Sequence, residues 1–338
     1  MTNPSKTKKQ LLIFLLPAYG IPYVMGLLLW YGSTISMMPE EMTPFPMAQM
    51  FCPAAGVMLA YLVTQWKDSL VPRWFYFSFL CLTALMILCA VLSVVAPEQT
   101  VMFHGRAVSM WLLFTEYVSI GGSLLCLTTL LLAGKQRRDA YGLSWKQSKS
   151  SVFCLLVFLI LYFGRAALLY LLDGQPGFIL EMLQDPAATI ALLIAPFRLL
   201  CTFAPFLGEE YGWRYYLQPI LQKRFGPRRG VLLLGAAWGI WHIFLDFFYY
   251  TTPDAGLSSN VLRIISCVTL GIFFAWAYNK TNNIWVPVIL HYLNNNLSFV
   301  YANTSTTMPH ILWMPLLNSI LFGLFLLSKE FRGIDDDQ

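Results

Sequence analysis

Long apolar segments are the feature that most constrains the fold of this chain. A helix needs roughly 20 apolar residues to cross a bilayer, and about ten such stretches follow one another here. They lie at residues 10–32, 50–66, 74–96, 109–133, 151–172, 188–208, 230–250, 262–279, 284–302 and 311–328. Charged residues make up only 12% of the chain, against about 25% in soluble domains. The sequence therefore predicts an all-α, polytopic integral membrane bundle of about ten transmembrane helices.

The distribution of Lys and Arg predicts the orientation of these helices, because cytoplasmic loops collect basic residues. With the N-terminus inside, seventeen of the 22 basic residues fall in cytoplasmic segments. They are Lys6, Lys8, Lys9, Lys67, Arg73, Lys135, Arg137, Arg138, Lys146, Lys149, Lys223, Arg224, Arg228, Arg229, Lys280, Lys329 and Arg332. The opposite side receives Arg106 and Arg263. Both termini are thus expected to be cytoplasmic, and the first stretch is expected to be a retained anchor helix because no signal-peptide cleavage site follows it.

The net charge of +5 belongs to the inner membrane face in this arrangement. Basic residues there meet anionic lipid headgroups, so membrane lipids are the expected partners and nucleic acid is not. The seven cysteines are scattered in apolar segments without metal-ligand or disulfide spacing, which indicates small core residues.

The basic connection 134–150 divides the chain into two expected regions. Residues 1–150 form an N-terminal four-helix accessory region, and residues 151–338 form a C-terminal membrane region with most of the intramembrane polar residues. Glu116 and Arg165 stand on the two sides of this divide, and we interpret them as a structural pair between the fourth and fifth spans.

A first polar motif, Glu209, Glu210 and Arg214, follows directly on an apolar stretch. On a continuing helix Glu210 and Arg214 are one turn apart, which is the spacing of an ion pair. Glu209 is rotated by roughly 100° and faces a different partner. A structural ion pair explains one acid, but the second leaves an excess negative charge where charges are costly. One glutamate is therefore expected to be held by Arg214, and the other to be available for proton transfer or metal binding.

A second motif, Trp238 and His242, lies in the next span, and Asp246 follows one turn later on the same helix face. An aspartate beside a histidine orients the ring and raises its basicity, as for metal ligands and general bases. The alternative is a structural histidine in an apolar helix, with Asp246 as its hydrogen-bond partner.

A third motif, His291 and Asn295, places an imidazole and an amide one helical turn apart. The histidine can act as ligand or donor, and the amide can donate toward a developing oxyanion. The alternative is a set of interhelical hydrogen bonds, above all for Asn294 and Asn296.

The depths of the three motifs in the membrane provide a test of whether they share one pocket. At about 1.5 Å per residue from the nearest cytoplasmic basic or loop residue, Glu209, His242 and His291 lie about 15 to 20 Å deep. Similar depths on three different spans favour one shared site over three unrelated structural groups.

Glu-Glu-x-x-x-Arg, aromatic-x-x-x-His and His-x-x-x-Asn, in this order over residues 188–302, resemble the CPBP family of intramembrane proteases. That family includes the CAAX prenyl endopeptidases and bacterial proteins linked to bacteriocin immunity. Trp238 stands where the family usually has Phe and keeps an aromatic platform. The resemblance implies an intramembrane endopeptidase that acts on peptide or lipidated-peptide substrates, and a bacterial plasma membrane as its location.

The resemblance also implies a catalytic set of Glu209, Glu210, His242, His291 and Asn295, with Arg214, Trp238 and Asp246 in support. Glu209 would activate water with help from His242, while Glu210 is tied to Arg214. His291 and Asn295 would line the oxyanion or metal side.

Two chemistries stay open for such a site. Glu209, His242 and His291 could ligate zinc, with water as a further ligand. However, the sequence lacks a His-Glu-x-x-His pair and Asn is a poor zinc ligand, so a metal-free glutamate mechanism is the other possibility.

Two other functions compete with the protease. A secondary transporter also has many spans and polar residues near the bilayer midplane, but the sequence has no inverted repeat and its polar residues cluster in one half. A catalytically silent immunity or scaffold protein could bind a partner in the same cavity.

Overall fold

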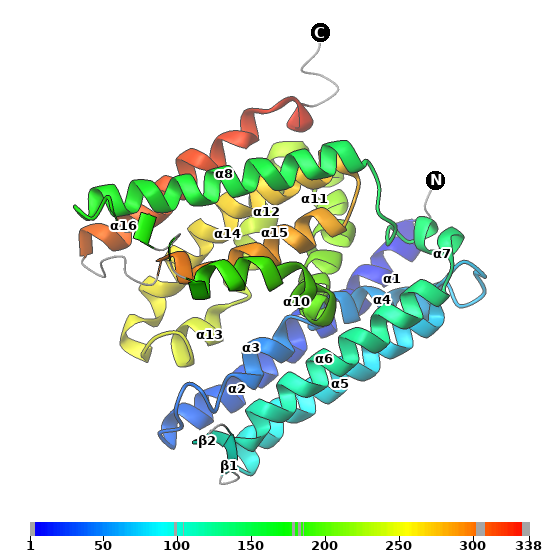
Figure 1. Ribbon diagram of the computed structural model, residues 1–338. Coiled ribbons are helices and arrows are strands. Elements are labelled where there is room, and N and C mark those ends of the chain that lie inside the picture. Colours follow the sequence, from blue (N-terminus) through cyan, green and yellow to red (C-terminus); the bar gives the residue numbers. More distant parts are fainter. Residues whose placement is uncertain are drawn as a thin grey trace. The chain divides into compact units, whose positions relative to one another are not determined.

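The computed structural model describes residues 4–97, 100–103, 105–177, 180–181, 184, 186–301 and 308–332, which fold almost entirely into helices (Figure 1). Within these residues, eight helical segments are long and apolar enough to cross a membrane. They are Lys6–Thr34, Pro44–Thr64, Arg73–Val95, Met110–Leu132, Ser148–Leu172, Thr189–Phe225, Pro227–Phe248 and Pro253–Thr281. The all-α polytopic fold is confirmed, and these segments correspond to the first eight predicted stretches.

The last two predicted stretches form shorter helices. The ninth contains α15 (Trp285–Asn296) and the 3-10 turn η3 (Ser298–Tyr301), and its last residue, 302, lies outside the described residues. The tenth contains α16 (Met308–Leu321) and the 3-10 turn η4 (Gly323–Leu327). Its apolar helical run covers Trp313–Leu327, which is shorter than the usual crossing length of about 17–25 residues. The count of ten spans and the cytoplasmic termini stay predictions.

The chain divides into two compact units, and the first consists of Met1–Ser144, Cys201–Tyr216 and Ile240–Val261. Its N-terminal helices are α1 (Pro4–Leu15), the π-helical η1 (Leu16–Gly20), α2 (Ile21–Thr34), α3 (Pro44–Gln49), α4 (Cys52–Thr64), α5 (Arg73–Val95), α6 (Met110–Leu132) and α7 (Lys135–Ala140). Helices α5 and α6 pack side by side (Figure 1). Pro17 lies in η1, and because proline cannot donate a backbone hydrogen bond, it favours such a loosened turn.

A β-hairpin connects α5 and α6 in the first unit, which the sequence analysis did not predict. Strand β1 (Thr100–Phe103) pairs with β2 (Arg106–Ser109) in antiparallel register, from Thr100 opposite Ser109 to Phe103 opposite Arg106. The turn contains Gly105 with a φ of 78°, which glycine adopts without steric cost.

The second unit consists of Trp145–Leu200, Leu217–Gly239 and Leu262–Gln338. Its further helices are α8 (Ser148–Leu172), the first part of α10 (Pro186–Glu210), α11 (Gln218–Phe225), α12 (Pro227–Ile240), most of α14 (Pro253–Thr281) and the 3-10 turn η5 (Lys329–Phe331). Two glycines bring α12 close to α14: a Cβ at Gly235 would lie 2.5 Å from the Cα of Val268, and one at Gly239 would lie 2.5 Å from that of Ile264. Small residues four apart are a common means of close helix packing in membranes.

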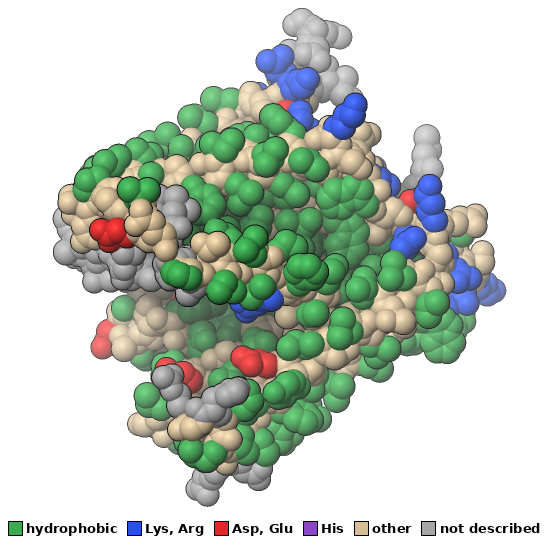
Figure 2. Space-filling model, viewed as in Figure 1, with side chains coloured by type: hydrophobic (Ala, Val, Ile, Leu, Met, Phe, Trp, Pro, Cys, Tyr) green, Lys and Arg blue, Asp and Glu red, His purple; other side chains and the backbone are tan. Residues whose placement is uncertain are grey.

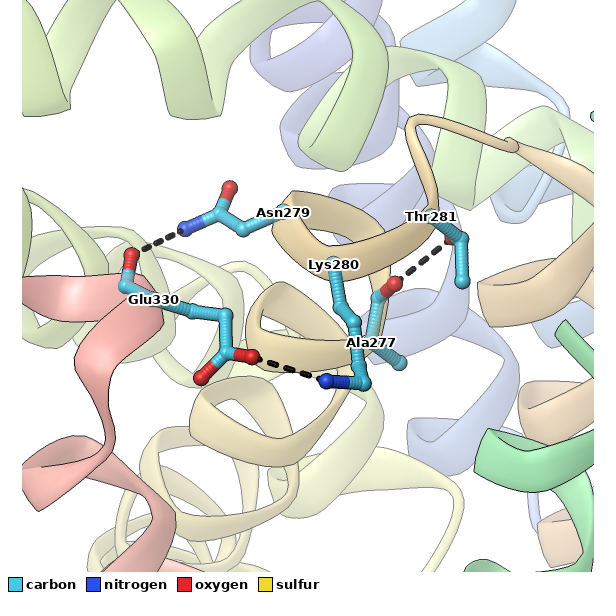
Figure 3. A network of polar contacts seen from close by, with 5 residues as sticks. All are labelled: Ala277, Asn279, Lys280, Thr281 and Glu330. Carbon is cyan, nitrogen blue, oxygen red and sulfur yellow. Dashed lines mark hydrogen bonds and ion pairs between the residues drawn. The ribbon is translucent and has the colours of Figure 1, made fainter. Parts of the chain in front are cut away.

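The C-terminal turn of the second unit is tied to the end of α14 by polar contacts (Figure 3). Lys280 Nζ lies 3.0 Å from Glu330 Oε1, and Asn279 Nδ2 donates to the backbone oxygen of Glu330 at 3.4 Å. Thr281 Oγ1 donates to the carbonyl of Ala277 at 2.6 Å within α14. The two contacts with Glu330 anchor η5 on residues that are expected at the cytoplasmic face.

Arg165 has partners in the second unit that the sequence analysis did not predict. Its guanidinium donates to Asn318 Oδ1 on α16 and lies over the rings of Tyr162, at 4.9 Å, and Phe322, at 5.6 Å. An amide and two aromatic rings thus surround this buried cation.

Candidate active site

The first motif lies at the end of α10 and in the π-helical segment η2 (Tyr211–Leu217). Helix α10 is kinked at Thr202, where φ is −135° and ψ is 25°. Pro205 has no N–H with which to donate to the carbonyl of Cys201, which explains the break. The residues after the kink belong to the first unit. Single π-helical turns occur frequently at functional sites.

The predicted ion pair between Glu210 and Arg214 is present. Arg214 Nε lies 3.2 Å from Glu210 Oε2, and both side chains have no exposed surface. Glu209, the neighbouring acid, is also buried, with 2% of its surface exposed. The arginine thus compensates the charge of Glu210 within the hydrophobic segment, and a second buried carboxyl group stands next to this pair.

A close backbone contact holds the first motif against the junction of α3 and α4. A Cβ at Gly208 would lie 2.3 Å from the carbonyl oxygen of Met50, and one at Gly212 would lie 2.3 Å from Cβ of Pro53. Gly208 and Gly212 flank the two glutamates, so no larger residue fits at either position without moving the backbone. The motif is therefore positioned by a segment that lies about 160 residues earlier in the chain.

Aromatic residues pack around Trp213 of the motif, which is fully buried. Its ring makes edge contacts with Phe14 at 6.2 Å, Tyr19 at 5.7 Å and Trp241 at 5.6 Å. Trp241 directly precedes His242, so this contact joins the first motif to the second within one unit.

A tyrosine network holds the opposite side of η2, which the sequence analysis did not foresee. The Tyr211 hydroxyl donates to the carbonyl of Tyr141 at 2.9 Å and lies 2.9 Å from the hydroxyl of Tyr76. The Tyr211 ring also stacks on Tyr215, with centroids 4.5 Å apart. The sequence signal that could have indicated this network is the presence of three tyrosines, Tyr211, Tyr215 and Tyr216, within residues 211–216.

His242 lies in a break between α12 and α13 (Ile243–Phe248), with φ of −86° and ψ of 0°. The expected continuous helix through His242 is therefore wrong. Trp241 explains the break: its Nε1 donates to the carbonyl of Ala18 at 2.7 Å, while Gln49 Nε2 donates to the Trp241 carbonyl at 3.0 Å. The Gln49 bond provides the Trp241 carbonyl with a partner from outside its helix, and the two bonds together fix the backbone beside the histidine.

Asp246 is fully buried and accepts hydrogen bonds from the beginning of α14. Asn260 Nδ2 donates to its Oδ2 at 2.9 Å, and Ser259 Oγ donates to its Oδ1 at 3.3 Å. Sequence reasoning considered only His242 as the partner of Asp246, because the two are four residues apart. The role of Asp246 in orienting the histidine stays a prediction.

The third motif lies on α15 in the second unit. His291 is 5% exposed, and its ring lies 5.6 Å from that of Trp238 and 6.0 Å from that of Phe274. Trp238 thus packs as an aromatic wall against the histidine, at 73° between the ring planes. The aromatic residue of the second motif and the histidine of the third are brought together.

The three asparagines of α15 form local side-chain bonds. The exposed Asn295 accepts from Asn294 Nδ2 at 3.1 Å, and Asn296 Nδ2 donates to the carbonyl of Tyr292 at 3.0 Å. The alternative interpretation assigned hydrogen bonds between helices to the asparagine side chains, whereas tyrosine side chains make such bonds here. Tyr162 donates to the carbonyl of Asn294 at 3.3 Å, and Tyr292 donates to that of Ala195 at 2.8 Å.

The candidate residues thus belong to two sets. Glu209, Glu210, Arg214, His242 and Asp246 lie in the first unit, whereas Trp238, His291 and Asn295 lie in the second. A single pocket that contains both sets stays a prediction. Across the described part of the chain, no group of three or more His, Cys, Asp or Glu side chains is arranged to hold a metal ion.

Comparison with known proteins identifies the region that contains the motifs. Residues 190–297 match the family described as type II CAAX prenyl endopeptidase Rce1-like. This range nearly coincides with the predicted core 188–302, and the resemblance stated from the three motifs is confirmed.

A curated relative is the CAAX prenyl protease 2 of Methanococcus maripaludis, which is 26% identical over 162 residues. The alignment covers 46% of this chain and 55% of the relative, so the chain spans about half the length of that protein. No solved structure matches the chain significantly. Because this relative is archaeal, a bacterial plasma membrane stays a prediction, whereas an integral membrane location is supported by the family and the apolar helices.

Proposed function

Because residues 190–297 belong to the CPBP family of CAAX proteases, we propose that this protein is an intramembrane endopeptidase for membrane-associated peptides. The main support is the buried pair of Glu210 and Arg214 beside the buried Glu209, within the matched region. A protein that needed only a structural ion pair would not require the second acid.

In the proposed mechanism, Glu209 and His242 position a water molecule and accept its proton as its oxygen attacks the peptide carbonyl. A carbon–oxygen bond forms, and the carbonyl oxygen takes up the negative charge. His291 and the Asn295 amide donate hydrogen bonds to that oxyanion. The carbon–nitrogen bond then breaks, and the proton taken from water is returned to the leaving amine. Glu210 stays paired with Arg214 and holds the helix turn.

Zinc held by Glu209, His242 and His291 is the second form of this proposal. These residues would supply one carboxylate and two imidazoles, and a bound zinc ion would supply the charge that activates water. None of the steps above uses a metal. Metal analysis of the purified protein decides between the forms, since stoichiometric zinc whose removal abolishes cleavage would end the metal-free version.

The substrate class follows from the name of the curated relative, a CAAX prenyl protease. We extend it to this chain as a preference for peptides with a lipid chain near the scissile bond. The apolar surroundings of the motifs suit a substrate that is already anchored in the membrane.

The decisive test is cleavage by purified protein in liposomes, with a prenylated peptide and its unprenylated counterpart as substrates. Glu209→Gln removes the carboxylate but keeps the side-chain shape, and we expect a loss of at least about 100-fold in kcat because general-base catalysis contributes that much. Glu116→Gln is the matched control: it makes the same change in α6, on an exposed residue outside the motifs, and should retain activity.

Mass spectrometry of the products gives the readout. If Glu209→Gln cleaves as fast as the wild type, the assigned role is refuted. If neither protein cleaves either peptide, membrane proteomics of cells that express each variant extends the test to natural substrates. If cells with the wild-type protein contain no cleaved peptide terminus that is missing from cells with Glu209→Gln, a catalytically silent immunity or scaffold protein is favoured.

A further inference from the structure

A cavity of about 270 Å³ lies in the first unit, and its lining contains none of the motif residues. It is formed where α5 begins and where α6 ends and α7 follows. The cavity is lined by Pro72, Arg73, Trp74, Thr129, Leu132, Ala133 and Arg137. Both arginines belong to the segments that the distribution of basic residues assigns to the cytoplasmic side. The proposed peptidase function does not involve this cavity.

The two arginines of the cavity are held in place by neutral carbonyl groups. Arg73 donates through Nη2 to the carbonyls of Trp66 and Asp68, the latter at 3.2 Å, and Arg137 donates through Nε to that of Ser69 at 3.1 Å. Within the described residues neither arginine has a carboxylate at ion-pair distance, and the Asp68 carboxylate interacts with Arg73 only at longer range. In addition, Arg73 Nε is buried and has no hydrogen-bond partner there. The cavity thus presents two fixed cations and an unused buried donor.

The first turn of α5 strengthens this positive character. The helix runs from Arg73 to Val95, and no side chain caps its N-terminus, since Pro72 is the preceding residue. The N-terminal end of a helix has a partial positive charge, which favours bound anions. The Arg73 N–H itself already donates to the carbonyl of Val71 at 2.8 Å. Further cations close by are Lys67 in the loop before α5 and Lys135 and Arg138 on α7, against the acids Asp68 in that loop and Asp139 on α7.

The mouth of the cavity is apolar. Trp74 is 77% exposed and Leu132 is 78% exposed. Trp66, which lies beneath the Arg73 guanidinium at 5.0 Å, is also exposed. Tryptophans at such positions are typical of the membrane–water interface, with the ring among lipid headgroups. Figure 2 shows Lys and Arg side chains gathered around the end where α7 lies, next to broad hydrophobic surface.

We propose that this cavity, the Arg73–Arg137 site, binds the phosphate of an anionic phospholipid. The two guanidiniums and the α5 N-terminus receive the phosphate oxygens, and Trp74 and Leu132 contact the beginning of the acyl chains. The volume is just below the range of about 300–1,000 Å³ typical of small-molecule pockets, which suits a headgroup but not two acyl chains. Fixed cations beside an exposed apolar rim favour a ligand with both a phosphate and an acyl chain over a wholly soluble anion.

The experiment uses the full-length protein in a non-ionic detergent and measures lipid retention by native mass spectrometry. Dioleoyl phosphatidylglycerol is the anionic probe, and dioleoyl phosphatidylcholine is the zwitterionic comparison. Arg137→Gln should lower retention of the anionic lipid by about tenfold, because it removes charge-assisted hydrogen bonds. Lys67→Gln, in the loop before α5, and Lys135→Gln, on α7, are matched controls, since each removes one positive charge from a residue outside the cavity lining.

Ala133→Leu is an independent variant that fills the cavity and leaves both arginines in place. It should also abolish the preference for the anionic lipid. This variant avoids the question of loop stability that Arg73→Gln would raise, since Arg73 holds the backbone of its own loop.

Three results would overturn the proposal. Retention that falls equally in Lys67→Gln, Lys135→Gln and Arg137→Gln would show diffuse attraction without a site. Unchanged retention in Ala133→Leu would place the lipid elsewhere. Displacement of the lipid by millimolar inorganic phosphate would make the ligand a soluble phosphate and not a phospholipid.

Discussion

Two buried arginines in this protein are accommodated by different side chains. Arg214 lies 3.2 Å from the carboxylate of Glu210, whereas Arg165 is surrounded by the amide of Asn318 and the rings of Tyr162 and Phe322. A buried ion pair is sensitive to loss of one partner, since the remaining charge stays in an apolar environment. The Glu210–Arg214 pair is therefore expected to matter for folding as well as for the position of Glu209.

We expect Glu210→Gln to lower the free energy of unfolding by about 3–5 kcal/mol, because it leaves the Arg214 charge without its carboxylate. The double variant Glu210→Gln/Arg214→Met removes both charges and should recover most of this loss. Unfolding in detergent, followed by tryptophan fluorescence, gives both values. Equal destabilisation of the single and double variants would contradict the coupling.

At the scale of elements, α10 and η2 are positioned by close backbone contact with the junction of α3 and α4. The approach at Gly208 and Gly212 leaves no room for a methyl group, since each Cβ would come within 2.3 Å of a neighbouring atom. The opposite side of η2 is held by hydrogen bonds through Tyr211. The π-helical turn is thus fixed on two sides, which keeps the two glutamates in a defined orientation.

Gly208→Ala is expected to destabilise the protein by about 1–3 kcal/mol, because the added methyl group collides with the carbonyl of Met50 and forces the backbone apart. Gly121→Ala is the matched control in the same unit, where a Cβ meets no atom within 4 Å. It should be neutral or stabilise α6 by up to about 1 kcal/mol. Thermal unfolding and cleavage rates of both variants test this, and equal behaviour of the two would refute the close contact.

The loops that follow α4 and α7 are joined by a pH-sensitive contact. Leu70 N–H and the Tyr141 hydroxyl each donate to the carboxylate of Asp68 at 2.8 Å. These hydrogen bonds, with that of Leu70 the larger effect, lower the pKa of Asp68. A carboxyl group with a lowered folded pKa stabilises the fold above its unfolded pKa of about 3.9, and this contribution is lost as the pH falls through the folded value.

Tyr141→Phe removes one of these donors and should reduce the acid sensitivity of the protein. Between about pH 6 and about pH 3, the thermal midpoint of the wild type should fall more than that of the variant. Parallel curves of the thermal midpoint against pH would mean that the Tyr141 hydrogen bond does not contribute to the lowered pKa of Asp68.

At the scale of the whole molecule, the fold is an all-α membrane protein with eight segments of crossing length in its described residues. The basic residues of the loops predict which ends face the cytoplasm. The proposed lipid site depends on the same predicted orientation, since anionic phospholipids are attracted to basic residues at the inner face.

Cysteine labelling in intact cells tests the orientation. With the seven native cysteines replaced, Glu40→Cys should react with a membrane-impermeant maleimide in intact cells. Gln136→Cys on α7 should react only after the membrane is opened, because α7 is expected at the cytoplasmic face. The reverse pattern would invert the topology.

Much of this protein was predictable from local patterns in the sequence. The length of each apolar stretch is a one-dimensional property, so the first eight membrane segments were correctly placed. The ion pair of Glu210 and Arg214 depends on a spacing within one helical turn, and the pair is present. The order of the three motifs likewise led to the family that matches residues 190–297.

Contacts between residues that are distant in the sequence could be identified only from the tertiary structure. The helix break at His242 depends on Gln49 and Ala18, and the hydrogen bonds to Asp246 come from Asn260 and Ser259. A helical repeat says which residues share a face, but it does not say which helix will lie against that face. Packing makes that choice, because buried donors and acceptors must find partners wherever the folded chain brings them.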